Sequence, residues 1–295
     1  MNDRISKEFP FRSNFIDVKG SEMHYIDEGI GAPILFIHGN PTSSYIWRNI
    51  IPYLSQNARC IAPDLIGMGQ SGKPKSNYQF LDHYEYLKAF IERLGLKQIS
   101  LVMHDWGSAL GFHYARKHSN NIKGMAFMEG IFKTNNWSDF EKEQKIGFKI
   151  MRAPVLGWLM VNVQQVFTRK ILPEMVLRPL SKEELLVYAA PYPNIKSRNP
   201  LRMWTKAIPI DGQPQDTFLI IETYHNWLKT TRIPKLCFYA EPGFIIKKKD
   251  VLWLMDNFED IELIPLGKGL HFLQEDHPHK IGIDLAKWYK RISTL

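Results

Sequence analysis

The chain has 295 residues, of which 44% are hydrophobic and 23% are charged, and its formal net charge at pH 7 is +8. This is the composition of a globular protein, and it excludes a disordered, collagen-like or coiled-coil chain. A divisor of about 150 residues per domain suggests two domains, although α/β folds of this length often form a single core. The two cysteines, Cys60 and Cys237, lie in apolar runs, so we expect buried free thiols and no disulfide framework.

The ends and the charge of the chain bear on where it acts. Residues 1–8 lack the apolar segment of a signal peptide, and no stretch of about 18 apolar residues predicts a membrane-spanning helix. A basic charge balance is typical of proteins that bind nucleic acid or anionic membranes. The longest basic run, however, is Lys247-Lys248-Lys249, and no nucleic-acid motif surrounds it. We therefore expect a cytoplasmic protein with no nucleic-acid and no membrane partner.

Short apolar runs alternate with helix-like stretches in the first half of the chain. Unbroken apolar runs of about five residues are typical of strands buried on both faces of a parallel sheet. Here they follow a hairpin at Gly20 and are separated by predicted helices. The expected strands are Phe15–Val18, Glu22–Asp27, Pro33–Ile37, Ala58–Ala62, Gln98–Met103 and Gly124–Met128, and the expected helices are Ser44–Leu54, Leu81–Leu94 and Gly107–Lys117.

The alternation stops from about Phe132 to Gly212, where seven prolines separate helix-like pieces, and resumes afterwards. The pieces are Phe140–Met151, Val161–Arg169, Lys182–Ala189 and Asn199–Lys206; later come helices at Asp216–Lys229, Val251–Asn257 and Pro278–Ile292 and strands at Lys235–Tyr239 and Ile261–Leu263. The pattern predicts an α/β fold with a mostly parallel eight-stranded sheet flanked by helices. The core would comprise residues 1–131 and 213–295, and residues 132–212 would form an inserted helical cap. The cap has thirteen lysines and arginines against seven acidic residues, so it holds +6 of the net charge.

One segment has the layout of a nucleophile elbow, in which a buried strand turns sharply into a helix that opens with small residues. It reads Leu101-Val102-Met103-His104-Asp105-Trp106-Gly107-Ser108, and Asp105 stands at the tip. A carboxylate is already deprotonated at neutral pH, and the positive end of the helix dipole stabilises it as a nucleophile. The alternative is that Asp105 only caps the helix. Ser108 lies a turn too late to be the nucleophile.

Other polar residues follow the neighbouring strands. His38-Gly39-Asn40-Pro41 follows the first parallel strand, where this fold type places an oxyanion-hole N–H. His271 follows the last predicted strand, a position that suits a general base. Glu129 and Glu241 both end predicted strands, and the order nucleophile, acid, base holds with either. The residues alone leave both open as the acid that orients His271.

Five segments in order together resemble the haloalkane dehalogenases of the α/β-hydrolase superfamily over nearly the whole chain. The resemblance implies that Asp105 is the nucleophile and His271 the general base. The resemblance is to the branch with an Asn in the first loop and a Glu after the sixth strand, which implies that Glu129 orients the histidine and that Asn40 and Trp106 bind the halide. The segments are 38–44 (HGNPTSS), 64–72 (DLIGMGQSG), 104–110 (HDWGSAL), 128–130 (MEG) and 269–276 (GLHFLQED).

The resemblance further implies hydrolysis of haloalkanes to alcohol, halide and proton through an alkyl ester on Asp105, with no cofactor and no metal. The partners would be a small halogenated aliphatic substrate, water and halide, and the protein would be a monomer or weak homo-oligomer. Two residues depart from the family pattern, Thr205 where proline is frequent and Met103 where a smaller residue is usual. By alignment, the pocket or tunnel would be lined by Phe148, Met151, Phe167, Met175, Trp204 and Ile245.

Three other functions stay open. Epoxide hydrolases share the aspartate, the histidine and the cap, and they protonate the epoxide oxygen with cap tyrosines, for which Tyr188 and Tyr192 are candidates. A coelenterazine-type luciferase, a cofactor-independent monooxygenase on this scaffold, keeps the same five site residues. A non-catalytic binding protein is disfavoured because the set is intact.

Overall fold

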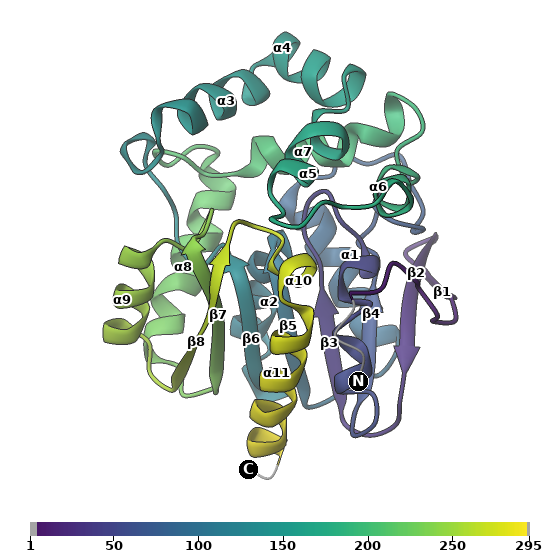
Figure 1. The fold of residues 1–295 in the computed structure, drawn as a ribbon, viewed down its shortest axis with the longest axis vertical. Helices are drawn as coiled ribbons and strands as arrows, with labels where there is room; N and C mark the ends of the chain where they lie inside the picture. Colours follow the sequence, from purple (N-terminus) through teal and green to yellow (C-terminus); the bar gives the residue numbers. More distant parts are fainter. Residues whose placement is uncertain (1–4, 294–295) are drawn as a thin grey trace.

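A computed structural model describes residues 5–293. An eight-stranded sheet runs through this part of the chain in the order β1-β2-β4-β3-β5-β6-β7-β8 (Figure 1). Strand β2 pairs antiparallel with β1 and β4, and all other neighbours pair in parallel, so the predicted mostly parallel sheet is confirmed. The strands are β1 (Asn14–Val18), β2 (Ser21–Glu28), β3 (Pro33–Ile37), β4 (Arg59–Pro63), β5 (Ile99–Asp105), β6 (Ile122–Gly130), β7 (Lys235–Pro242) and β8 (Ile261–Gly269).

Strands β7 and β8 are longer than predicted. After a register shift, Glu241 pairs with Lys268 and Pro242 with Gly269. Residues 264–269, which lie beyond the predicted strand Ile261–Leu263, are therefore the end of β8. Because His271 follows two residues later, the extended ladder brings it to the carboxyl ends of the parallel strands, where ligands bind in open α/β sheets.

Side chains of the inner strands alternate between two apolar layers, as expected for strands covered on both faces. In β3, Leu35 and Ile37 pack into one cluster, and Ile34 and Phe36 pack into the other. The first cluster includes α1 (Phe80–Arg93), α2 (Trp106–Lys117), α8 (Gln215–Thr230) and α9 (Lys248–Asn257), and the second includes α10 (Leu273–Asp276) and α11 (Pro278–Ser293). Cys60 and Cys237 are buried free thiols, as predicted.

The predicted helix Ser44–Leu54 is wrong in type. The segment forms two short 3₁₀ turns, η1 (Ser44–Trp47) and η2 (Ile51–Tyr53). Pro52 lies in the second turn and has no backbone N–H to continue a helical ladder. The apolar spacing nevertheless buries Ile46, Trp47 and Ile50 against the sheet, which is why it resembled a helix.

The segment between β6 and α8 forms short helices that lie above the carboxyl ends of the strands (Figure 1). The continuous helix predicted at Val161–Arg169 is instead two π-helical turns, with Gln165 at φ 59° between them. A bridge pairs Asn135 with Ile210, so the two ends of the segment meet. The division into core and cap at 132–212 stays a prediction. The helical elements are η4 (Trp137–Asp139), α3 (Lys142–Arg152), α4 (Pro154–Trp158), η5 (Leu159–Val163), η6 (Phe167–Ile171), α5 (Leu172–Glu174), α6 (Lys182–Ala189), η7 (Lys196–Arg198) and α7 (Asn199–Ala207).

No single helix within residues 5–293 has the length and apolar character needed to cross a membrane. One pair of helices, Lys142–Arg152 with Pro154–Val163, meets the criterion of length and composition jointly, but it is bent by 88°.

Candidate active site

Asp105 stands at the turn between β5 and α2. Its backbone has φ 49° and ψ −127°, and such a positive φ costs a non-glycine residue about 1–3 kcal/mol. Two glycines make room for the turn. A Cβ at Gly39 would lie 2.4 Å from Asp105 Oδ2, and a Cβ at Gly107 would lie 2.1 Å from the carbonyl oxygen of Ile37. The backbone therefore has the tight strand-to-helix geometry of a nucleophile elbow.

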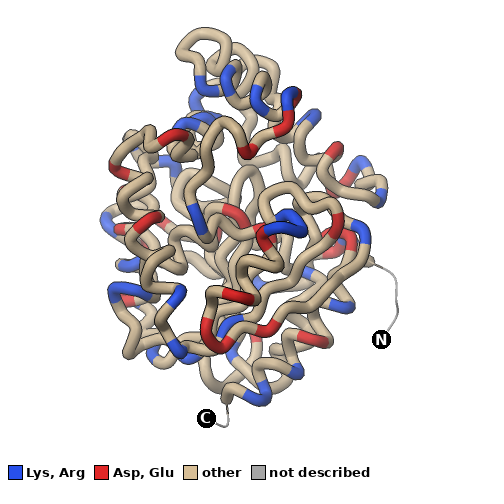
Figure 2. The backbone as a smooth tube through the Cα atoms, turned by 90° about the vertical axis from the view of Figure 1, so that its left-hand side faces the viewer, with Lys and Arg blue, Asp and Glu red and all other residues tan. Residues whose placement is uncertain are grey.

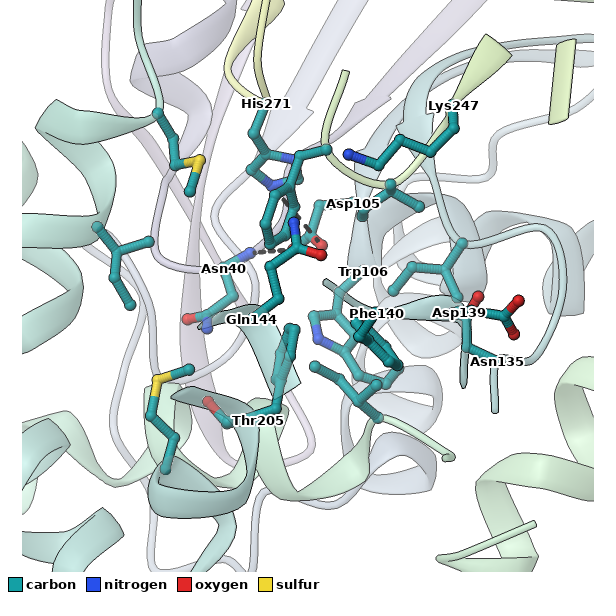
Figure 3. Close-up of a pocket in the computed structure, with 18 of the residues that line it drawn as sticks. Asn40, Asp105, Trp106, Asn135, Asp139, Phe140, Gln144, Thr205, Lys247 and His271 are labelled. Atoms are coloured by element: carbon teal, nitrogen blue, oxygen red, sulfur yellow. Dashed lines mark hydrogen bonds and ion pairs between the residues drawn. The ribbon is translucent and has the colours of Figure 1, made fainter. Parts of the chain in front are cut away.

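Backbone donors and a histidine surround the Asp105 carboxylate. The N–H of Asn40 donates to Oδ2 at 2.8 Å, and His271 Nε2 lies 3.9 Å from Oδ1 (Figure 3). Burial raises the pKa of Asp105, while His271 and backbone hydrogen bonds from Trp106 and Asn40 act against that rise. The anion is thus largely removed from water but supported by fixed N–H groups, a state that favours attack on an apolar substrate.

His271 is paired with Glu129 on its other side. Its Nδ1 lies 3.2 Å from Glu129 Oε2. Glu129 is fully buried, and its carboxylate also accepts the backbone N–H groups of Phe244 and Ile245 at 3.0 and 2.6 Å. Glu241, the other candidate acid, is exposed at the end of β7. The geometry therefore pairs the histidine with Glu129, and the carboxylate fixes an Nδ1–H tautomer whose Nε2 faces Asp105.

Asn40 and Trp106 both lie next to Asp105 (Figure 3). Asn40 is 8% exposed in the loop after β3, and Trp106 is 2% exposed at the start of α2. Both line the same cavity as Asp105 and His271. Two polar side chains are thus held beside the carboxylate in a nearly dry wall, where hydrogen bonds to a developing anion are strongest.

Trp204 does not have the position in the pocket wall that the sequence predicted. It does not appear among the described residues that line this cavity. It is fully buried and stacks on Trp106, with ring centroids 4.6 Å apart and an interplanar angle of 27°. It also stacks on His83, with ring centroids 4.0 Å apart, and burial lowers the pKa of His83 to about 3. Trp204 therefore supports the Trp106 indole from behind.

Three polar residues near the turn form hydrogen bonds with backbone groups and so have a structural role. His38 Nε2 accepts the Leu65 N–H at 2.9 Å, so its Nδ1–H donates to the carbonyl of Gly39. His104 Nε2 lies 3.0 Å from the carbonyl oxygen of His271, and burial keeps the pKa of His104 well below its usual value. The Ser108 hydroxyl donates to the Asp105 carbonyl at 2.6 Å and accepts the Ile131 N–H at 2.7 Å. Ser108 is thereby occupied in the backbone around the elbow.

Five of the six predicted pocket residues line the cavity: Phe148, Met151, Phe167, Met175 and Ile245. The sequence did not indicate further lining residues, some aromatic and some polar. Phe244 and Phe272 flank His271, with ring centroids 5.5 and 4.7 Å from its ring. Their positions next to Ile245 and His271 could have indicated them. The polar lining residues that were not predicted come from two short stretches with no common motif: Lys133, Asn135, Asp139 and Gln144, and Lys247, Lys249 and Asp250.

The two departures from the family pattern have local explanations. A Cβ at Gly111 would lie 2.2 Å from the Met103 sulfur, so the absence of a side chain at Gly111 accommodates the larger residue. Thr205 lines the cavity, but its hydroxyl donates to the Leu201 carbonyl at 3.1 Å within α7. Its polar group is therefore satisfied inside the helix.

The cap tyrosines do not face the Asp105 carboxylate. The Tyr188 hydroxyl donates to Glu275, and the Tyr192 hydroxyl donates to the carbonyl of Pro41 at 3.2 Å. Neither ring is among the described residues that line the cavity. These tyrosines are therefore not placed to protonate an epoxide bound at Asp105.

Comparisons with known proteins agree on one family. Residues 32–278 match the model of the alpha/beta hydrolase fold. The chain is 43% identical over 286 residues to a haloalkane dehalogenase of Mesorhizobium japonicum, covering 96% of this chain and 92% of that protein. It is 42% identical over 292 residues to one of Sphingobium indicum, covering 96% and 97%. The crystal structure of a haloalkane dehalogenase from Bradyrhizobium elkani superposes with a TM-score of 0.94 at 41% identity, covering 96% of this chain and 99% of that one.

Proposed function

Because this chain belongs to the haloalkane dehalogenases of the α/β-hydrolase fold, we propose that it hydrolyses haloalkanes to an alcohol, a halide ion and a proton. The observation that carries the proposal is the arrangement in space of the Asp105, His271 and Glu129 side chains. His271 lies between the Asp105 and Glu129 carboxylates at 3.9 and 3.2 Å, at the wall of a cavity that Asn40 and Trp106 also line.

In the first step, an Asp105 oxygen attacks the carbon that carries the halogen. A carbon–oxygen bond forms while the carbon–halogen bond breaks, and the electron pair leaves with the halide. The indole N–H of Trp106 and the side-chain N–H of Asn40 donate to the leaving halide as it gains charge. Preorganised donors of this kind are typically worth about 10²–10³ in rate each. The product is an alkyl ester on Asp105.

In the second step, His271 Nε2 takes a proton from a water molecule whose oxygen attacks the ester carbonyl of Asp105. Glu129 holds the imidazole and stabilises its charged form. The backbone N–H groups of Asn40 and Trp106 support the oxyanion, since both already donate to the carboxylate. Collapse of the intermediate releases the alcohol, regenerates Asp105 and leaves one net proton for solvent.

The finer predictions about partners and location remain proposals of the same kind. We infer a small halogenated aliphatic substrate, a monomer or weak homo-oligomer, a cytoplasmic location and no nucleic-acid partner. A luciferase that acts on coelenterazine keeps the same five residues and is therefore the alternative to test. The epoxide hydrolase alternative is disfavoured by the positions of Tyr188 and Tyr192.

The test is halide release and acidification on a panel of brominated alkanes of different chain length. We expect release with the natural chain and none above background with Asp105→Ala. We expect His271→Ala to release at most one equivalent of halide and to gain the mass of the alkyl group, because its ester cannot be hydrolysed.

Absence of halide release across the panel would overturn the proposal, and light emission with coelenterazine would then favour the luciferase. Many turnovers by His271→Ala would leave the dehalogenase assignment in place but would reject the histidine as the base.

A further inference from the structure

The outer end of the cap exposes apolar side chains. Helix α4 and the π-helical turn η5 follow each other without a break from Pro154 to Val163. Within them, five large apolar residues are exposed, and we call them the cap tip. Their exposed fractions are 68% for Val155, 54% for Leu156, 38% for Trp158, 38% for Leu159 and 39% for Val163. Exposed apolar residues that gather in one place mark interaction surfaces more often than chance.

Basic residues flank the cap tip on both sides along the chain. Between Lys142 and Leu172 there are six lysines and arginines and one acidic residue, Glu143. Figure 2 shows Lys and Arg below the uncharged apex of the cap. Arg202 also lies close, because its guanidinium donates to the Pro154 carbonyl at 3.0 Å. The cap tip is thus an apolar surface with a positive surround, and this accounts for much of the cap's excess charge.

We propose that the cap tip is a docking surface for an anionic lipid bilayer. Exposed Trp, Leu and Val would enter the boundary between head groups and acyl chains, and the flanking Lys and Arg would contact anionic head groups. The sequence predicted no membrane partner because it holds no spanning segment. A contact at the interface needs no such segment, and the 88° bend after α3 turns the tip away from that helix.

Charge favours a bilayer over a second copy of the chain. A symmetric contact between two cap tips would bring two positively charged surrounds face to face, and like charges oppose each other in such an interface. Anionic head groups instead complement the basic residues that flank the tip, except Arg152, whose guanidinium donates to the carbonyls of Ile208 and Gln213.

The cap tip is continuous with a wall of the cavity. Helix α3, which precedes it directly, carries Gln144, Phe148 and Met151, and all three line the cavity. Apolar molecules move from water into hydrocarbon, so haloalkanes concentrate in bilayers. Docking would place α3 next to that reservoir. This consequence rests on the proposed function, whereas the lipid contact itself does not.

The test is co-sedimentation of the full chain with vesicles of phosphatidylcholine, with and without phosphatidylglycerol. We expect binding to the anionic vesicles, weaker binding to neutral ones and loss of binding as salt screens the charges. Leu156→Asp should weaken binding about tenfold, since one buried leucine side chain supplies that much. Leu252→Asp on α9 is the matched control, because Leu252 is 53% exposed against 54% for Leu156.

Several results would overturn the proposal. These are no binding to anionic vesicles, equal losses in Leu156→Asp and Leu252→Asp, or sedimentation velocity that shows a dimer broken by Leu156→Asp without vesicle binding. Halide release from a water-soluble bromoalkane should be unchanged in Leu156→Asp. This measurement of halide release distinguishes failure of the lipid contact from failure of the proposed function, because it does not depend on vesicles.

Discussion

The two walls of the cavity are held in different ways. On the sheet side, backbone groups fix the reacting side chains, as when the Asn40 N–H binds Asp105 and the Phe244 and Ile245 N–H groups bind Glu129. On the cap side, apolar side chains such as Phe148 project from short helices interrupted by π-helical turns. The first wall depends on geometry that few substitutions preserve. The second depends on side-chain volume, which substitutions change easily.

The walls are joined at one edge. The carbonyl of Met175, in the cap, accepts the backbone N–H groups of both His271 and Phe272 at 3.3 Å. Farther along the same segment, the buried carboxylate of Glu275 binds Arg48 from the core at 2.6 and 2.8 Å and also binds Arg178 from the cap. The cap is therefore tied to the segment that carries the histidine.

A substitution of Glu129, on the sheet wall, should have the largest effect on kcat. Glu129→Gln removes the charge that stabilises the His271 imidazolium, and one backbone donor then faces an amide N–H. We expect kcat to fall about 10³–10⁴-fold, as when the acid of a triad becomes an amide. Rapid-quench measurement of halide should still show a first-turnover burst, because the loss lies in ester hydrolysis. Glu241→Gln, an exposed change of the same kind, should keep full activity; equal losses in both would refute the assignment.

A substitution of Trp106 tests whether this side chain on the sheet wall contributes to catalysis through its indole N–H. Trp106→Phe keeps the aromatic ring but removes the indole N–H, and we expect kcat on a bromoalkane to fall about 10²–10³-fold. Trp204→Phe is the matched control, since Trp204 is stacked behind Trp106 and its own N–H has no partner among the described residues. It should lose less than about tenfold, the worth of a ring contact. Steady-state kinetics on both variants would decide, and similar losses would mean that packing, not donation, matters.

Phe148 tests the cap wall, where we expect selectivity to change more than rate. Phe148→Ala should shift the ratio of kcat/KM between long and short bromoalkanes by about tenfold in favour of the longer ones. The kcat for the shortest substrate should change less. Ile146→Ala is the control. Ile146 lies on the same helix but is 50% exposed and is not among the described lining residues, so its substitution should leave the ratio of kcat/KM unchanged. A large fall in kcat for all substrates would show that the two walls are not separable.

The sequence predicted the sheet wall better than the cap wall, and the reason is physical. The strand before Asp105 is buried at every position and is mostly apolar, and such short apolar runs indicate a buried strand. The choice between Glu129 and Glu241 needed the family resemblance, because both end a strand and only the tertiary fold buries one of them. In the cap, the break at Gln165 and the place of Trp204 behind Trp106 depend on packing between short helices, which periodicity does not record.

The smallest expected effect concerns the cost of keeping Asp105 charged on the sheet wall. Burial raises its pKa in the folded state, so the folded chain binds this proton more tightly than the unfolded chain. The charged carboxylate therefore lowers stability at neutral pH, and this cost disappears as pH falls below the ordinary value near 3.8. Asp105→Asn, inactive as a dehalogenase, should raise Tm at pH 7 by about 1–2 °C, a small shift because the entropy of unfolding is large in a chain of 295 residues. Calorimetry of both proteins from neutral to acidic pH should show the gap closing; a gap that widens toward acid would mean that hydrogen bonds to the carboxylate outweigh its burial.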